Sequence, residues 1–263
     1  MMLQAACERR HVARAERVIV TSAYTARCVR EFYGLPANPV VIPELIDLER
    51  WQPLLRGARS APDPFSFTVL CVCRLYRRKR VGLLLEAAAR LRSRIPELAV
   101  RIVGDGPEGA RLRSMADTMR LPGLVTWLGD ISDEEVAEEY RRANVFCLPS
   151  VQEGFGIVFL EAMAAGVPIV AARASSVPEV LPQGLLVEPE SAEALAAGLA
   201  QLHSDARLRE RLAAAGQERV TEFDAPRIAH QFLDEILSIV AARPPAVFSS
   251  GDESTATGPD TAV

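Results

Sequence analysis

Two carboxylates, Glu153 and Glu161, stand eight residues apart in a stretch that also holds two glycines. The apolar run at 145–148 is typical of a buried strand, and a helical pattern begins at Ile157. Glu153 is therefore expected in a loop, and Glu161 about a turn and a half into the following helix. Each carboxylate can accept two hydrogen bonds from a diol, so hydroxyl-rich ligands suit this pair.

The loop before this helix indicates a second ligand group. Gly154 and Gly156 predict a tight turn at the N-terminus of the helix. Backbone N–H groups at a helix N-terminus lack partners, and the helix dipole there favours an anion. The amides of Phe155 and Gly156 are the expected donors. Phosphate groups beside pairs of hydroxyls describe a nucleotide sugar.

A basic segment follows the first strand of the predicted sheet. Residues 74–80 read RLYRRKR, and five of the seven are basic. Such side chains can neutralise a diphosphate in a partly desolvated cleft. A solvated basic patch or a nucleic-acid contact is the alternative for a charge run taken alone. The net charge of −4 indicates no general nucleic-acid binder.

The elements that must position these residues alternate between strand and helix. This alternation predicts an α/β domain with a Rossmann-like parallel sheet, covered on both faces, that binds ligands at the carboxyl ends of its strands. Strands are expected at 67–75, 99–103, 125–128, 145–148, 168–172 and 185–187, and helices at 81–91, 108–119, 133–142, 157–165, 191–203, 205–222 and 225–242.

The chain divides by composition into four parts. Residues 1–50 contain two predicted helices, the second capped by Ser22, and short extended segments. Residues 51–66, with several prolines and polar residues, predict a linker. Residues 67–242 form the predicted Rossmann-like domain, and the tail at 243–263 is rich in Pro, Ser, Thr and Gly and is predicted to be disordered.

The stretch with both carboxylates carries a family resemblance. EGFGIVFLEAMAAGVPIVA resembles the Glu-x7-Glu block of retaining glycosyltransferases with the GT-B fold, specifically the large family four. The similarity covers about residues 12–240. It implies that the sheet domain is the C-terminal half of a GT-B fold. The implied reaction moves a sugar from a nucleotide diphosphate sugar to a hydroxyl acceptor with retention of configuration.

The resemblance implies a role for each site residue. Glu153 would orient the donor sugar, and Glu161 would hold the ribose. Arg74 and Lys79 would bind the diphosphate, and these two with Glu153 form the expected catalytic set. The remaining expected donor-binding residues are Gly129 and Ile131 near the base, and Gly154, Phe155 and Gly156 near the phosphates.

Three further features were interpreted by position. The sequence GDGP at 104–107 either shapes the floor of the donor cleft, as in the family, or is only a tight turn. Arg77, Arg78 and Arg80 are assigned to the surface. Ser175, Ser176 and Glu179 are interpreted as loop and helix cap.

The resemblance also implies a missing half. Residues 1–50 match the end of the family's N-terminal acceptor domain and its crossover, although Glu44 and Leu45 stand where the family usually has Asn-Gly. Three explanations remain open: a fragment or misplaced start, one subunit of a split enzyme whose partner chain supplies the N-terminal domain, or a nucleotide-sugar-binding module without catalysis. A related nucleotide-sugar enzyme, such as an epimerase, is a further alternative.

Composition limits the remaining functions. The five cysteines form no CxxC pair, and the three histidines lack ligand spacing, so neither a metal nor another cofactor is expected. A signal peptide and a membrane-length apolar run are also lacking. We therefore expect a cytoplasmic protein, or one at the periphery of the membrane. The sugar, the nucleotide and the acceptor are left open.

Overall fold

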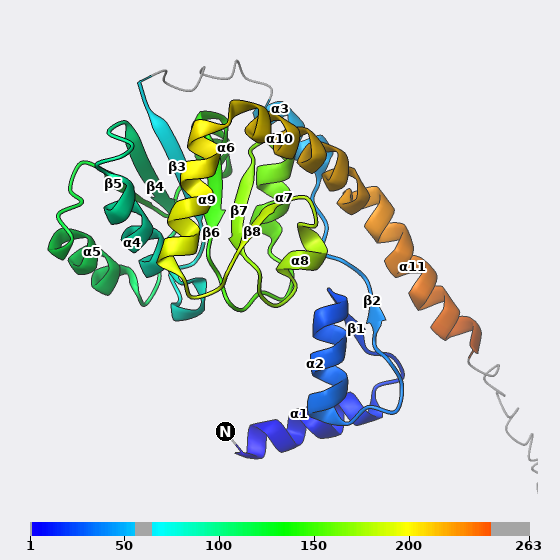
Figure 1. Cartoon of the computed structure of the whole chain (residues 1–263). Helices are drawn as coiled ribbons and strands as arrows, with labels where there is room; N and C mark the ends of the chain where they lie inside the picture. The colour runs from blue at the N-terminus through cyan, green and yellow to red at the C-terminus, as the bar shows by residue number, and fades with distance from the viewer. Residues whose placement is uncertain (1, 56–64, 243–263) are drawn as a thin grey trace, which may run out of the picture.

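The computed structural model describes residues 2–55 and 65–242 and is built around a six-stranded parallel sheet with helices on both faces (Figure 1). Its strands are rich in apolar residues, and those at the centre of the sheet are buried on both faces, as expected for strands covered by helices on two sides. They are β3 (Phe67–Val72), β4 (Leu98–Val103), β5 (Val125–Gly129), β6 (Val145–Leu148), β7 (Ile169–Ala172) and β8 (Leu185–Val187).

The strand order is β5-β4-β3-β6-β7-β8, so the chain starts in the middle and winds outward in both directions. Val69 pairs with Val145 and Leu70 with Phe146 where the two halves meet. Connections leave β3 and β6 toward opposite faces, which opens a crevice at their carboxyl ends. This crevice is the topological switch point of the sheet.

Right-handed crossovers place α4 and α5 on one face and α6 and α7 on the other (Figure 1). Helix α9 packs on α4, and helix α10 packs on α7. The helices that follow β3 along the chain are η1 (Arg77–Lys79), α4 (Val81–Leu91), α5 (Gly109–Thr118), α6 (Asp133–Arg142), α7 (Ile157–Ala164), α8 (Val177–Val180), α9 (Ala192–Ser204), α10 (Ala206–Val220), η2 (Thr221–Phe223) and α11 (Ala225–Ala242).

The core beneath α6 and α7 is aromatic. Tyr140, Phe146 and Phe159 are fully buried, and their rings pack in series at centroid distances of 5.7 and 6.0 Å. This stack fixes α6 and α7 against β6. It therefore helps to hold in place α7, the helix that begins beside the switch point.

The N-terminal segment forms a small unit of its own. It consists of α1 (Met2–Arg14), β1 (Ile19–Val20), α2 (Ala23–Tyr33) and β2 (Val40–Val41), with β1 and β2 paired in parallel, whereas α3 (Leu48–Leu55) packs on α6 and α7 of the sheet domain. Ser22 caps α2 by accepting from the Thr25 amide at 3.1 Å, and Gly34 ends it in the left-handed conformation, as predicted.

Helix α11 extends beyond the sheet domain toward the N-terminal unit (Figure 1). Of its residues only Ile228 is buried. An ion pair of 2.6 Å joins Glu235 to Arg17 of the N-terminal unit. One side of the helix is apolar and exposed, and it carries Phe232, Leu233, Ile236, Leu237 and Val240. None of the described helices is long and apolar enough to cross a membrane.

Two sequence predictions are corrected. The linker predicted at 51–66 is wrong for 51–55, which complete α3 because Trp51 and Leu55 pack against the core, with the Trp51 ring on Tyr140. The strand predicted at 67–75 ends at Val72, because the backbone then turns and the Tyr76 amide donates to the Arg74 carbonyl. Residues 56–64 and the predicted disordered tail lie outside the described residues, and the division into domains stays a prediction.

Candidate functional site

The residues after β3 meet the residues after β6 at the switch point. The short helix η1 leaves β3, and the loop 149–156 leaves β6. The carbonyl oxygen of Arg78 accepts from the Val151 amide and from the Ser150 hydroxyl, each at 3.1 Å. These bonds fix the basic turn to the loop that carries Glu153.

Lys79 and Glu153 form a buried ion pair in this contact. Lys79 Nζ lies 2.5 Å from Glu153 Oε1, and the two side chains are 11% and 6% exposed. Arg78 Nη1 lies 3.8 Å from Glu153 Oε2 and donates to the Gln152 carbonyl at 3.1 Å. Arg78 is exposed, as predicted, with 42% of its side chain accessible, and its guanidinium lies at the rim of the site.

The backbone of Glu153 is held from the next strand along the sheet. Its amide donates to Ser175 Oγ at 2.8 Å, and its carbonyl accepts from Ser176 Oγ at 2.9 Å. Ser176 is fully buried and makes no side-chain cap on α8. Both serines lie in the loop before α8, as interpreted, and Ser176 is the N-cap residue of that helix, but its hydroxyl bonds Glu153 instead of the helix. The sequence feature that could have indicated this contact is the pair of adjacent hydroxyl side chains after β7, at the same edge of the sheet as Glu153.

Helix α7 begins beside this pair without a side-chain cap. Its N-cap residue Gly156 has φ 97°, and a Cβ there would lie 2.6 Å from the Phe159 ring, so the position requires glycine. Phe155 is buried, with its ring 5.4 Å from that of Phe223. Any contribution of Phe155 to the site comes from its backbone. First-turn amides without a side-chain cap leave donors for an anion.

The N-terminal unit contacts the same loop. The carbonyl of Gly154 accepts from the hydroxyls of Thr21 and Thr25 at 3.1 and 3.4 Å. Glu179 of α8 accepts from the Ala23 amide at 2.8 Å, so it caps the N-terminus of α2 rather than its own helix. The loop that carries Glu153 is thus held from both sides.

Glu161 lies half-buried on α7 and is bonded to a tyrosine of α6. Its Oε2 accepts from the Tyr140 hydroxyl at 2.9 Å, and that hydroxyl also lies 3.1 Å from the Val158 carbonyl. Burial raises the pKa of Glu161, and the hydrogen bond from Tyr140 opposes this shift. Burial, with the nearby Glu161 carboxylate, holds the pKa of Tyr140 well above its usual range. Tyr140 was missed by the sequence reasoning, because in the sequence it is only an apolar position of the predicted helix 133–142.

The other predicted residues lie along the same edge. The side chain of Arg74 is exposed and forms no hydrogen bond or ion pair with any described residue. Gly104, at φ 104°, lies so close to the Cys73 carbonyl that a Cβ would approach to 2.2 Å, and its amide donates to the Gly129 carbonyl at 2.7 Å. The GDGP turn therefore supports the segment after β3. Ile131, half-buried, follows Gly129 at the end of β5, three strands away from the β6 strand that precedes Glu153.

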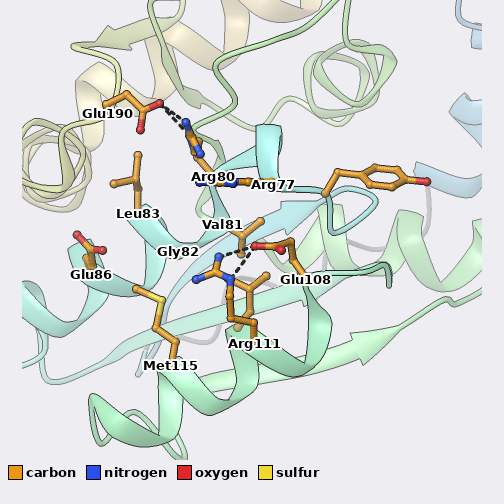
Figure 2. A pocket seen from close by; sticks show the side chains of 12 residues that line it. Arg77, Arg80, Val81, Gly82, Leu83, Glu86, Glu108, Arg111, Met115 and Glu190 are labelled. Carbon is orange, nitrogen blue, oxygen red and sulfur yellow. Dashed lines mark hydrogen bonds and ion pairs between the residues drawn. The ribbon is translucent and has the colours of Figure 1, made fainter. Parts of the chain in front are cut away.

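A pocket of about 410 Å³ lies on the opposite side of η1, between the N-terminal ends of α4 and α5 (Figure 2). Its charged side chains are largely paired, since Arg80 donates to Glu190 at 2.8 and 2.6 Å and Arg111 lies 2.6 Å from Glu108. The residues that line it include none of those predicted from the sequence. It is therefore distinct from the switch-point site.

This geometry agrees with the family that the sequence matches. Residues 59–219 match the sequence profile of the glycosyl transferases group 1, so the chain belongs to this glycosyltransferase family. The recognition made from the Glu-x7-Glu block is confirmed at this level.

Curated relatives carry more specific names. The chain is 33% identical over 221 residues to a GDP-mannose-dependent alpha-(1-6)-phosphatidylinositol monomannoside mannosyltransferase of Mycobacterium tuberculosis, which covers 78% of this chain and 57% of the relative. It is 31% identical over 245 residues to a D-inositol 3-phosphate glycosyltransferase of Corynebacterium urealyticum, a match that covers 87% of this chain and 58% of the relative. The chain spans less than two thirds of the length of either relative.

Solved structures confirm the predicted fold class. A sucrose-phosphate synthase from Thermosynechococcus elongatus superposes with a TM-score of 0.79 at 30% identity, covering 92% of this chain and 63% of that one. HepE of Anabaena, solved with UDP and glucose, gives 0.79 at 23% identity over 90% of this chain and 67% of its own, which shows the fold alone. The chain has the sheet domain of a GT-B glycosyltransferase.

Proposed function

We propose that this chain is the donor-binding part of a glycosyltransferase that moves a sugar from a nucleotide diphosphate sugar to a hydroxyl acceptor with retention. The observation that carries this proposal is the buried contact between Lys79 and Glu153 at the switch point, beside the uncapped start of α7. A cation, a hydroxyl-binding carboxylate and free amides together suit a diphosphate joined to a sugar.

In this proposal the diphosphate is the leaving group, and stabilising its developing charge is the main electrostatic task. Lys79 supplies a buried cation, and Arg74 a free guanidinium at the end of β3. The amides at Phe155 and Gly156 add the positive end of the α7 dipole. These groups neutralise the diphosphate without a resident metal, so no metal is assigned a role.

The two carboxylates take different parts of the donor. Glu153 orients the sugar through its hydroxyls. Glu161 holds the ribose with the oxygen that Tyr140 does not occupy, since Tyr140 bonds only Oε2. The backbone around Gly129 and Ile131, at the end of β5, takes the base.

The comparisons support a nucleotide diphosphate donor without naming it. One relative is described as GDP-mannose-dependent, while structural neighbours were solved with UDP and glucose. Because the chain covers little more than half of its relatives, transfer is proposed to need a further domain, in a longer protein or from a partner chain. The acceptor would bind between the two parts.

Calorimetric titration of the chain with UDP, GDP and ADP and their glucose and mannose forms tests this proposal. We expect one nucleotide series to bind, and we expect Lys79→Ala and Glu161→Ala to lose it. Arg80→Ala is the matched control, because Arg80 is adjacent to Lys79 but pairs with Glu190 outside the site. A folded chain that binds none of these ligands at millimolar concentration would overturn the proposal, as would full binding by both variants.

A further inference from the structure

The two groups that the proposed function assigns to different parts of the donor are bonded to each other in the free protein. Lys79 Nζ, assigned to the diphosphate, lies 2.5 Å from Glu153 Oε1, assigned to the sugar. A bound donor must therefore compete with this ion pair for both groups. The state of Glu153 after that exchange depends on which ligand is bound.

Glu153 cannot easily move its charge into water. Its side chain is 6% exposed, and Ser175 and Ser176 hold its backbone on both sides. The turn that carries Lys79 is fixed to the same loop through the Arg78 carbonyl. Lys79 can shift along a flexible stem, whereas the carboxylate stays where it is.

A buried carboxylate without a partner is strongly unfavourable. In the free protein Lys79 satisfies Glu153. In the complex with a nucleotide sugar, Lys79 turns to the diphosphate and the sugar hydroxyls replace it as donors to Glu153. In the complex with the nucleoside diphosphate alone, Lys79 is still drawn to the phosphates and no sugar is present.

The remaining cation near Glu153 compensates only in part. Arg78 Nη1 lies 3.8 Å from Glu153 Oε2, beyond hydrogen-bond distance, and its side chain is 42% exposed. Without the sugar, Glu153 therefore competes with the phosphates for one buried cation, and two anions face each other across it. Such like charges in a desolvated site repel strongly.

We propose that the Lys79–Glu153 ion pair makes this site discriminate for the sugar-bearing donor and against the nucleoside diphosphate left after transfer. The inference rests on the proposed function. Glu153 would then act twice, orienting the sugar while it is present and expelling the spent nucleotide once the sugar has left.

The test is the ratio of two dissociation constants, for the nucleoside diphosphate and for its sugar form, measured by calorimetry on the full chain. In Glu153→Gln the charge is removed and the size is kept. We expect the diphosphate alone to bind roughly 5- to 100-fold more tightly than to the unsubstituted chain, the range expected when an unpaired buried charge is removed. The sugar form gains less, because it loses a charged acceptor, so the ratio falls.

Two further variants separate charge from structure. Glu153→Asp keeps the charge and is expected to keep the weak binding of the diphosphate. Glu190→Gln removes an exposed carboxylate paired with the adjacent Arg80 and should leave both constants unchanged. Thermal unfolding of each variant reports whether it is folded.

Each outcome has a distinct meaning. If the unsubstituted chain binds both ligands and Glu153→Gln leaves their ratio unchanged or raises it, the inference is overturned and the proposed function stands. If the unsubstituted chain binds neither ligand, the proposed function fails and the inference fails with it. An equal change of the ratio in Glu190→Gln would show a general effect of charge and would also overturn the inference.

Discussion

Two neighbouring residues of one turn form ion pairs that differ in burial. Lys79 and Glu153 are 11% and 6% exposed, whereas Arg80 and Glu190 are 31% and 53% exposed. Both pairs tie the segment after β3 to a later loop of the chain. Arg80 adopts the left-handed conformation at φ 53°, which directs it away from Lys79 toward the pocket of Figure 2.

The strength of each ion pair therefore depends on where it lies relative to the sheet rather than on the type of charge. The exposed pair is screened by water and contributes little. Both charges of the buried pair are shielded from water, so removing one partner leaves the other as an unpaired buried charge. Only the buried pair can therefore respond strongly to a ligand.

The largest expected effect comes from breaking the buried pair on one side. Lys79→Ala should lower the free energy of unfolding by about 3–5 kcal/mol, because Glu153 remains buried without its cation. Arg80→Ala, the matched change one residue later, should lower it by less than about 1 kcal/mol. Urea unfolding measures both. Equal losses would show that burial does not distinguish the two pairs.

Removing both partners together should restore much of the loss. The double variant Lys79→Met with Glu153→Gln carries no unpaired charge and should be more stable than Lys79→Met alone. A double-mutant cycle should give a coupling energy of about 1–3 kcal/mol, within the range for residues in direct contact. A coupling energy near zero would contradict a strong interaction between Lys79 and Glu153.

A third carboxylate, Glu161, is half-buried and has a tyrosine as its partner instead of a cation. Burial raises its pKa in the folded state, so the folded protein binds this proton more tightly than the unfolded chain does. Its contribution to stability is therefore greatest at low pH and falls as pH rises from the ordinary glutamate range through the raised pKa. Glu161→Gln should flatten this slope in urea unfolding measured across pH 4 to 7.

Tyr140→Phe provides the control for Glu161. It removes the hydrogen bond that opposes the shift, so the pKa of Glu161 should rise further and the slope should extend to higher pH. An unchanged pH profile in both variants would show that Glu161 does not titrate in this window.

The smallest expected effect concerns the exposed pair and salt. Glu190→Ala should change the free energy of unfolding by less than about 1 kcal/mol at low ionic strength, and the change should vanish in about 1 M salt, where charges are screened within a few ångströms. The coupling between Lys79 and Glu153 should persist in the same salt. If high salt abolished the coupling between Lys79 and Glu153 as well as the effect of Glu190→Ala, this would contradict the desolvation of the buried pair.

Features that depend on neighbours along the chain could be predicted from the sequence. The Ser22 cap of α2 appears as expected, because its partner lies three residues away, and the capping box of Ser132 and Glu135 at α6 has the same local spacing. The alternation of apolar strands and helices likewise predicted the sheet. The position of Lys79 and Glu153 at one edge followed from the rule that parallel strands share their carboxyl ends.

Contacts between distant segments could not be predicted in this way. Tyr140 reaches Glu161 from another helix, and Ser176 reaches the carbonyl of Glu153 from beyond β7. Helix α3 contains Pro53 and reads as a linker, yet Trp51 finds the Tyr140 ring as a packing partner. In each case the sequence shows the residue type, while the partner depends on the finished packing of the sheet domain. The roles of these residues toward a ligand stay predictions.

The strand order has a consequence for how the domain assembles. Residues 67–129 make one half of the sheet and residues 145–187 the other, and each half pairs strands that follow one another in the chain. The two halves join along β3 and β6, where the backbone register holds Val69 against Val145 and Leu70 against Phe146. Closing this seam needs contacts distant in sequence, which form late and slowly.

A ligand at the switch point would span that seam. Its contacts with the segment after β3 and with the loop after β6 would join the last two parts of the domain to meet during folding. Ligand binding would then slow hydrogen exchange of the backbone amides along β3 and β6, because the ligand disfavours states in which the two halves of the sheet are apart.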